Sequence, residues 1–114
     1  MPHFVMDCSQ DIFVSHDEAF IIEQLFLQAG ATNLFDERDI KVRINSFEKY
    51  SVGNKREPFI HVFASIMQGR TTEQKAMLSQ QVVSKLVTLF PNVPNIAMNI
   101  SDFEMATYCN RTMV

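Results

Sequence analysis

Pro2 is the first residue whose type and position could carry out chemistry. Proline is small enough for the initiator methionine before it to be removed, which would leave a free secondary amine. An α-amino group has a pKa of about 8. Burial or a nearby cation lowers that pKa, so that the amine becomes a base close to neutral pH. Many chains that begin Met-Pro have no catalytic role, so Pro2 alone leaves the function open.

Arg70 and the pair Lys41 and Arg43 are candidates for binding an anion. Arg70 follows Gly69 and precedes a predicted helix. The first N–H groups of a helix are unpaired and its dipole is positive at that end, which suits a carboxylate. Lys41 and Arg43 share one face of a predicted strand, where they could stabilise a carboxylate or an enolate oxygen. A solvated loop arginine and an exposed strand face are the alternatives that the sequence leaves open.

Composition argues against several other classes of protein. The 114 residues are 46% hydrophobic and 20% charged, which is typical of a globular chain and predicts one domain over residues 1–114. The net charge of −3 gives no basic face for nucleic acid. No apolar run approaches the roughly 20 residues that span a bilayer, and the N-terminus is not a signal peptide. We therefore expect a cytoplasmic protein without membrane or nucleic-acid partners.

The sequence has no motif that is typical of metal binding, hydrolysis or redox chemistry. His3, His16 and His61 lack the spacing of metal ligands, so no metal site is predicted. His16 is interpreted as a surface residue, and His61 as a hydrogen-bonded core or interface residue. Cys8 and Cys109 are too few for a disulfide framework and are expected to be reduced. No P-loop, GxGxxG or Ser-His-Asp order is present, and a cofactor-free acid–base isomerisation fits best.

An internal repeat indicates the elements that must position these residues. Residues 43–48 and 99–104 share an Ile-x-x-Phe-Glu pattern, and Pro2 and Pro58 lie at the same offset. Two successive β-α-β units are therefore predicted, and each should pair its strands in parallel through a right-handed crossover. The units cover about residues 2–50 and 58–106. The four predicted strands are His3–Asp7, Lys41–Phe47, Phe59–Met67 and Ile96–Phe103.

Two capping boxes predict where the helices begin. Ser15-x-x-Glu18 and Thr71-x-x-Gln74 both fit the pattern. The first helix should run from about Glu18 to Ala29 and end at Gly30, with an apolar stripe of Ala19, Ile22, Phe26 and Ala29. The second should run from about Thr72 to Phe90 and stop at Pro91, with a stripe of Ala76, Val83, Leu86 and Phe90.

The apolar residues on both faces of the third predicted strand indicate that the chain forms an oligomer. One of its faces carries Phe59, Phe63 and Met67, and the other carries Ile60, Val62, Ala64 and Ile66. Both faces are apolar and both should be covered. Two helices can cover only one face of a four-stranded sheet, which favours a homo-oligomer. The predicted class is α+β, with a four-stranded mixed sheet and two helices on one face.

Taken in order, these motifs resemble the 5-carboxymethyl-2-hydroxymuconate isomerases of the tautomerase superfamily. The resemblance covers nearly the whole chain and rests on Met1–Phe4, Ala31–Phe35, Ile40–Arg43, Phe59–Val62 and Gly69–Lys75. The last stretch is also similar to 4-oxalocrotonate tautomerases. The resemblance implies a tautomerase/MIF-like subunit, a homotrimer and a place in aromatic catabolism. It also implies cofactor-free proton transfer between the enol and keto forms of a carboxylated muconate.

The resemblance implies roles for four residues. The family's proline base falls on Pro2, and an arginine before the second helix falls on Arg70. Pro2 would move the proton, Arg70 would hold one carboxylate, and Arg43 with Lys41 would stabilise the 2-oxo end. The family commonly has arginine at both of these last positions, and lysine cannot make the forked contact of arginine. A phenylpyruvate-like substrate and a non-catalytic binding protein on the same scaffold therefore stay open as alternatives.

Overall fold

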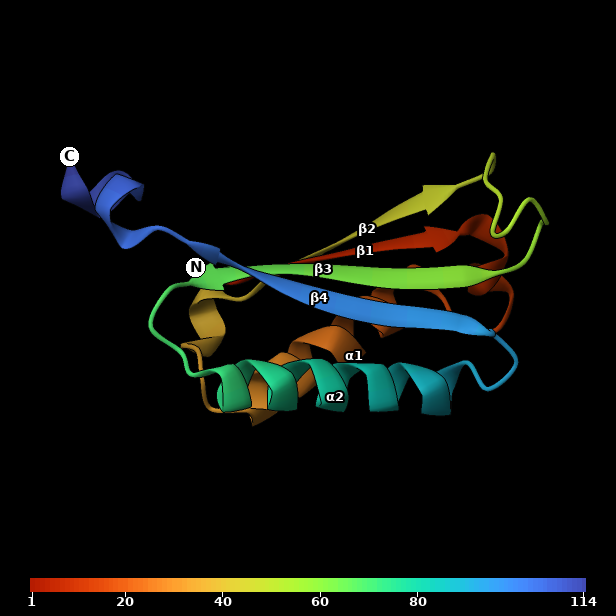
Figure 1. Ribbon diagram of the computed structural model, residues 1–114, viewed down its shortest axis with the longest axis horizontal. Helices are drawn as coiled ribbons and strands as arrows, with labels where there is room; N and C mark the ends of the chain where they lie inside the picture. Colours follow the sequence, from red (N-terminus) through yellow and green to blue (C-terminus); the bar gives the residue numbers. More distant parts are fainter.

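The computed structural model describes residues 1–114, which form a four-stranded sheet with two helices on one face (Figure 1). The strands are β1 (His3–Ser9), β2 (Lys41–Phe47), β3 (Phe59–Met67) and β4 (Asn95–Phe103). Their order is β2-β1-β3-β4. β1 pairs with β2 and β3 pairs with β4 in parallel, and the central pair β1–β3 is antiparallel. The predicted pair of β-α-β units and the mixed sheet are confirmed.

The second helix, α2 (Thr72–Leu89), begins at the predicted capping box. The Thr71 hydroxyl accepts a hydrogen bond from the Gln74 N–H at 3.1 Å, and the Gln74 side chain accepts one from the Thr71 N–H at 2.9 Å. These two bonds satisfy donors that a helix start leaves unpaired. The helix ends at Leu89 with Phe90 as its cap, just before Pro91, as the sequence predicts.

The predicted cap of the first helix, α1 (Glu18–Ala31), is wrong. Asp17 is the N-cap, and its carboxylate accepts a hydrogen bond from the Phe20 N–H at 2.8 Å. Ser15 has helical backbone angles because it ends the short 3-10 turn Gln10–Val14, whereas a cap residue needs the extended angles that Asp17 has. Gly30 lies inside the helix, and the left-handed conformation after its end is taken by Asn33, with φ of 58°.

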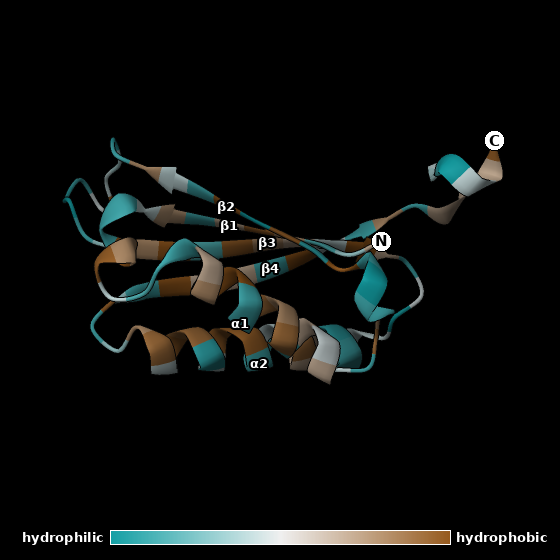
Figure 2. Ribbon diagram, turned by 180° about the vertical axis from the view of Figure 1, so that it is seen from behind, coloured by the Kyte–Doolittle hydropathy of each residue, from teal (hydrophilic) through white to brown (hydrophobic).

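The predicted apolar stripes also need correction. The buried residues of α1 are Ile21, Leu25 and Ala29, and those of α2 are Leu78, Val82 and Leu86. Only Ala29 and Leu86, with Phe90 beyond the end of α2, were placed correctly. Apolar residues surround α1 on most sides, so several stripes fit its sequence and only the packed sheet selects one. Figure 2 shows hydrophobic segments in the strands and in both helices, which lie together on one side of the sheet.

The core lies between the helices and the inner face of the two central strands. Phe4, Met6 and Cys8 of β1 are fully buried there, beside Ile60, Val62 and Ala64 of β3. His16 is half-buried rather than a surface residue, because its ring stacks on Phe20 and contacts the Leu89 carbonyl through Nε2 at 3.0 Å. This contact ties the start of α1 to the end of α2. Neither helix combines the length and apolarity needed to cross a membrane.

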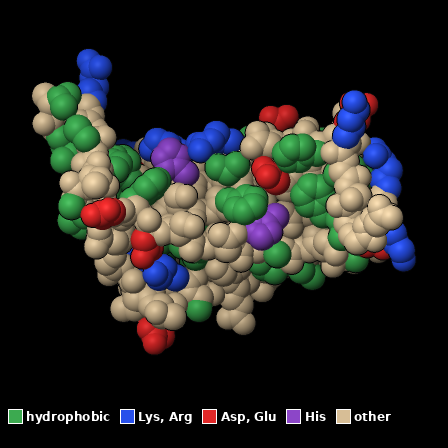
Figure 3. Space-filling view, turned by 45° about the horizontal axis from the view of Figure 1, so that its top comes forward, with side chains coloured by type: hydrophobic (Ala, Val, Ile, Leu, Met, Phe, Trp, Pro, Cys, Tyr) green, Lys and Arg blue, Asp and Glu red, His purple; other side chains and the backbone are tan.

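The opposite face of the sheet has no helix over it. Phe63 is 43% exposed on this face, and Phe47 is 39% exposed. His61 lies beside them, stacked on Phe63 and hydrogen-bonded to the Asn99 side chain at 2.6 Å. Figure 3 shows hydrophobic side chains and histidines gathered on the surface of the molecule turned toward the viewer. The division of β3 into two apolar faces is thus confirmed, while the assembly that would cover the open face stays a prediction.

Candidate active site

Pro2 and Arg70, two of the predicted site residues, line one pocket at the end of the sheet. The pocket has a volume of about 260 Å³ and is lined by Met1, Pro2, Phe35, Asp36, Asp39, Met67 and Arg70. It forms because β1 and β3 are antiparallel, so that the start of β1 lies beside the end of β3. The residue before β1 and the residue after β3 are therefore neighbours in space although they are far apart in sequence.

Backbone pairing in the sheet and a glycine turn hold these two residues in place. Pro2 is buried, and its carbonyl accepts a hydrogen bond from the Lys41 N–H at 3.1 Å, which extends the β1–β2 pairing by one step. Gly69 has φ of 117°, a conformation that residues with a Cβ rarely adopt. That turn brings Arg70 back toward the pocket between β3 and α2.

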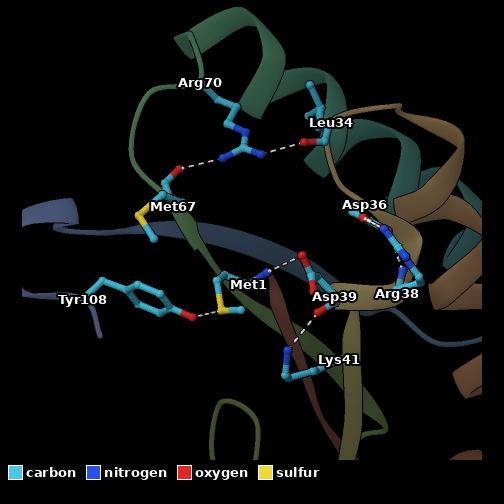
Figure 4. A network of polar contacts seen from close by, with 9 residues as sticks. All are labelled: Met1, Leu34, Asp36, Arg38, Asp39, Lys41, Met67, Arg70 and Tyr108. Carbon is cyan, nitrogen blue, oxygen red and sulfur yellow. Dashed lines mark hydrogen bonds and ion pairs between the residues drawn. The ribbon is translucent and has the colours of Figure 1, made fainter. Parts of the chain in front are cut away.

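The Arg70 side chain is half-buried and has defined partners, so the alternative of a solvated loop arginine does not describe it. Its Nη2 donates to the Leu34 carbonyl at 2.6 Å and its Nη1 donates to the Met67 carbonyl at 3.2 Å (Figure 4). Its Cζ lies 5.2 Å from the centre of the Phe35 ring. A guanidinium has five N–H donors, so these contacts orient it and leave donors for an anion.

The N-terminal amine lies among opposing charges. The Met1 nitrogen is 3.9 Å from the Asp39 carboxylate, and the Met1 sulfur contacts the Tyr108 hydroxyl (Figure 4). Burial is the largest influence and lowers the pKa of this amine; Lys41 and Arg70 lower it further, whereas Asp39 and Asp36 raise it. While Met1 is attached, the Pro2 nitrogen is an amide nitrogen and cannot act as a base.

Lys41 and Arg43 lie on the open face of β2, as their spacing predicts, and both are exposed. The Lys41 ammonium donates to the Asp39 backbone carbonyl at 2.9 Å, which places it at the edge of the pocket. Arg43 Nη1 lies 3.1 Å from His3 Nδ1. Burial first, and then Arg43 and Lys41, lower the pKa of His3. Arg43 does not line the pocket, so within one chain it stays apart from Pro2 and Arg70.

Asp36 and Asp39 are pocket residues that the sequence reasoning missed. Both belong to the segment Asp36-Glu37-Arg38-Asp39, which forms a 3-10 turn over Glu37–Asp39 just before β2. The two-contact pair with Arg38, at 2.7 and 3.1 Å, lowers the pKa of Asp36 to about 2. The signal that could have indicated them is their position, because residues just before β2 must lie beside the start of the parallel strand β1.

The pocket combines a buried N-terminal segment, an oriented guanidinium and two carboxylates, and the chain has no group of three or more His, Cys, Asp or Glu side chains placed to hold a metal ion. With a free amine at Pro2, such a pocket could accept a proton from a bound anion and return it at another atom. The predicted residues Pro2 and Arg70 come together, Lys41 lies at the edge and Arg43 lies outside.

The sequence and the fold were compared with those of known proteins. The family model of 5-carboxymethyl-2-hydroxymuconate isomerase matches residues 2–110. Among solved structures, a 5-carboxymethyl-2-hydroxymuconate isomerase from Deinococcus radiodurans R1 has a TM-score of 0.84 and 18% identity, over 96% of this chain and 88% of that chain. No curated protein matched this sequence.

Two other solved structures widen the comparison. A fused 4-OT described as a symmetric trimer has a TM-score of 0.77 and 10% identity, over 98% of this chain and 94% of that one. The macrophage migration inhibitory factor from Trichinella spiralis has a TM-score of 0.76 and 12% identity, over 96% of both chains. At these identities the likeness concerns the fold, which is the tautomerase/MIF-type fold.

Proposed function

This chain belongs to the 5-carboxymethyl-2-hydroxymuconate isomerase family, and we propose that it interconverts the enol and keto forms of a carboxylated, 2-hydroxymuconate-like substrate without a cofactor. The family supports an isomerase of the tautomerase type. The observation that carries the proposal is the presence of buried Pro2 and oriented Arg70 in one pocket. A base and an anion-binding group within one pocket are what proton transfer in a carboxylated enol requires.

In the proposed mechanism Met1 is removed and the neutral Pro2 amine is the base. Pro2 takes the proton of the enol hydroxyl, which gives a dienolate and a prolinium. The prolinium then returns that proton to a distant carbon of the conjugated chain, which gives the unsaturated ketone and restores the neutral amine. The same nitrogen thus acts as base and then as acid, and no proton is gained or lost overall.

The pocket supports this role of the amine through its effect on the pKa. An amine of pKa about 8 is only about 10–15% neutral at pH 7, so an unshifted amine would be mostly unable to accept a proton. Burial, Lys41 and Arg70 all lower the pKa of the N-terminal amine in this pocket. We propose that the same groups act on the Pro2 amine after removal of Met1, because Pro2 is buried and lines the same pocket.

We assign the substrate carboxylate to Arg70. Its bonds to the Leu34 and Met67 carbonyls fix the plane of the guanidinium, which lowers the entropy lost when an anion binds. The exposed cations Lys41 and Arg43 are proposed to stabilise the 2-oxo end. Lys41 is the nearer of the two, because its ammonium lies at the pocket edge.

The test is an ultraviolet assay of 2-hydroxymuconate ketonisation, with the intact mass of the same protein sample. We expect loss of one methionine and turnover. Insertion of one alanine before Pro2 keeps the proline ring but makes its nitrogen an amide nitrogen, and should lower kcat by at least about 100-fold. Pro58→Ala, at the matching position of the second unit, is the control. Undiminished turnover by the inserted variant would exclude Pro2 as the base.

A second candidate function, a non-catalytic binding protein, is favoured by contacts that Met1 itself makes. Its amine lies 3.9 Å from the Asp39 carboxylate, so the amine of an unprocessed chain has a polar partner in the pocket. If Met1 is retained in cells and no enol is turned over, this second function replaces the first.

We further propose a homotrimer. The open face of the sheet, with Phe63 43% exposed on its central strand, supports an assembly. The trimeric number is suggested by the fused 4-OT, whose structure is described as a symmetric trimer.

A further inference from the structure

The residue that follows Pro2 in the chain, His3, is the only side chain that holds Arg43. Arg43 Nη1 donates to His3 Nδ1 at 3.1 Å, and the guanidinium has no other hydrogen-bond or ionic partner. The His3 ring is half-buried on the open face of the sheet, where its edge contacts Phe103, with ring centres 5.8 Å apart. The ring is therefore held from one side by β4 and bonds to β2 on the other.

This contact determines the protonation state of His3. A guanidinium has N–H donors and no acceptor, so the Nδ1 atom must accept the hydrogen bond. A ring nitrogen that accepts a hydrogen bond carries no proton, and a neutral imidazole then has its proton on Nε2. The geometry thus requires a neutral His3 in the Nε2–H form.

The charged groups that act on His3 are all positive. They are Arg43 and Lys41 on β2 and the N-terminal amine, whereas β3 places the uncharged Ser65 opposite His3 and β4 contributes Phe103. Burial first, and then these cations, lower the pKa of His3. A neutral ring is consequently the main form at neutral pH, which is the form that the contact with Arg43 needs.

Arg43 depends on this acceptor because its side chain is otherwise free in solvent. An exposed arginine samples many rotamers, and a contact that selects one of them lowers the entropy lost when the guanidinium meets an anion. Protonation of His3 would remove the acceptor and place a second positive charge next to the guanidinium. The orientation of Arg43 is therefore linked to the charge of His3.

We propose that His3 is a positioning residue, whose neutral Nδ1 holds Arg43 in the orientation that stabilises the 2-oxo end of the substrate, and that protonation of His3 releases it. This inference rests on the proposed function, from which it takes the role of Arg43. His3 does not line the pocket of its own chain and takes no part in the proton transfer. The contact lies within one chain, so it holds whichever subunit's pocket Arg43 serves in an assembly.

A double-mutant cycle tests whether His3 acts through Arg43. His3→Leu removes the acceptor and should lower kcat/KM for 2-hydroxymuconate about three- to tenfold at about pH 7.5. In an Arg43→Ala background the same substitution should change kcat/KM less than about twofold, because the group on which His3 acts is gone. No loss in the first background, or an equal loss in both, overturns the proposal, since a merely structural role would be felt in both.

His3→Asn separates the acceptor from the charge. The asparagine oxygen lies as many bonds from Cα as Nδ1 does, so it can accept the Arg43 bond, but it does not titrate. This variant should recover most of the activity that His3→Leu loses. Its kcat/KM relative to wild type should rise about threefold or more between about pH 7.5 and about pH 5, where wild-type His3 becomes protonated.

His61→Gln is the matched control for this pH profile. His61 is also on the open face, but it stacks on Phe63 and contacts the Asn99 side chain, far along β3 from Arg43. The ratio of its kcat/KM to that of wild type should stay constant within about twofold over the same pH range. A ratio for His3→Asn that is equally constant would contradict the release of Arg43 by protonation.

Nuclear magnetic resonance of the histidine ring nitrogens separates this proposal from the proposed function, because it needs no turnover. In the processed protein, His3 should carry its proton on Nε2, and Arg43→Ala should raise its pKa. Arg38→Ala, whose guanidinium is held by Asp36, should leave that pKa unchanged. A proton on Nδ1, or a pKa that Arg43→Ala does not move, overturns the proposal even in an active enzyme. The expected spectra from a protein without turnover would support the His3–Arg43 contact and contradict the proposed function alone.

Discussion

The N-terminal amine lies between charges of both signs, and its pKa reflects their balance with burial. Burial contributes most and lowers the pKa, Lys41 and Arg70 act in the same direction, and Asp39 and Asp36 oppose them. The base must be neutral to accept a proton, so activity should rise with pH as the amine loses its proton. The midpoint of that rise should lie below the ordinary value of about 8.

Two substitutions should move this midpoint in opposite directions. Asp39→Asn removes a negative charge that favours the ammonium form, so the acid limb of the kcat/KM profile should shift to lower pH. Lys41→Gln removes a positive charge, so the same limb should shift to higher pH. The measurement is kcat/KM against pH for the three proteins at one ionic strength. Coincident midpoints would mean that neither side chain influences the base.

Arg70 should matter more for binding than the exposed arginine of β2. Hydrogen bonds to a charged group contribute about 1.5–3 kcal/mol, so Arg70→Ala should lower kcat/KM roughly 10- to 100-fold. Arg70→Lys should recover little, because lysine cannot bond to the Leu34 and Met67 carbonyls as a fork. Arg111→Ala, in the exposed C-terminal segment, should leave kcat/KM unchanged. A normal kcat/KM for Arg70→Ala would contradict the assignment of the substrate carboxylate to Arg70.

At the residue scale, the sequence predicted those site residues whose type alone indicates a chemical role. Pro2 and Arg70 were selected by type and by their place beside predicted elements, and the structure brings them into one pocket. Asp39 was missed, although its position in the 3-10 turn just before β2 could have indicated that it lies beside the start of β1. Arg43 was placed on the correct strand face, but its distance from Pro2 depends on the packing of whole elements.

At the scale of elements, the caps give a direct test of the corrected start of α1. Asp17→Ala should lower the free energy of unfolding by about 1 kcal/mol, because it removes the acceptor of the Phe20 N–H. Ser15→Ala should cost less, since the Ser15 hydroxyl donates only to the Ile12 carbonyl at 3.3 Å. Both losses in the free energy of unfolding are measured from urea unfolding midpoints, with one denaturant slope used for all the proteins. A larger loss for Ser15→Ala would restore the first assignment of the cap.

The elements were predicted more reliably than the faces they bury. All four strands and both helices were placed within a few residues, since β-branched runs, the capping box of α2 and Pro91 are local signals. The buried stripe of α1 was mostly wrong because Ala19, Ile21, Ile22 and Leu25 are all apolar and local periodicity does not choose among them. The surface of the sheet against which α1 packs determines which stripe is buried, and no short stretch of the sequence specifies that surface.

At the scale of the whole molecule, the open face of the sheet predicts how the chain assembles. Phe63→Asp places a charge at the centre of this face and should convert the proposed trimer to monomers. Val87→Asp, at a residue that is 50% exposed on α2, changes side-chain type in the same way and should leave the assembly intact. Light scattering after size-exclusion chromatography measures both masses. An unchanged mass for Phe63→Asp would place the interface elsewhere.

Whole-molecule features were predicted in part. An assembly was expected because two helices cannot cover both faces of four strands, and the uncovered face is present. The single domain over residues 1–114 and the number of subunits stay predictions. The C-terminal segment after β4 extends away from the sheet (Figure 1), and no local pattern in the sequence indicated its course.

The position of β1 in the middle of the sheet has a consequence for biosynthesis. Phe4 pairs with Val42 on one side and with Ala64 on the other, so both neighbours of β1 are translated after it. Closing such long loops must precede the pairing, which slows folding relative to a helical bundle of similar size. Until β3 has left the ribosome, the nascent chain exposes an apolar strand with one unpaired edge. Such intermediates bind chaperones or aggregate, so the yield of this protein should depend on how fast β3 follows β1.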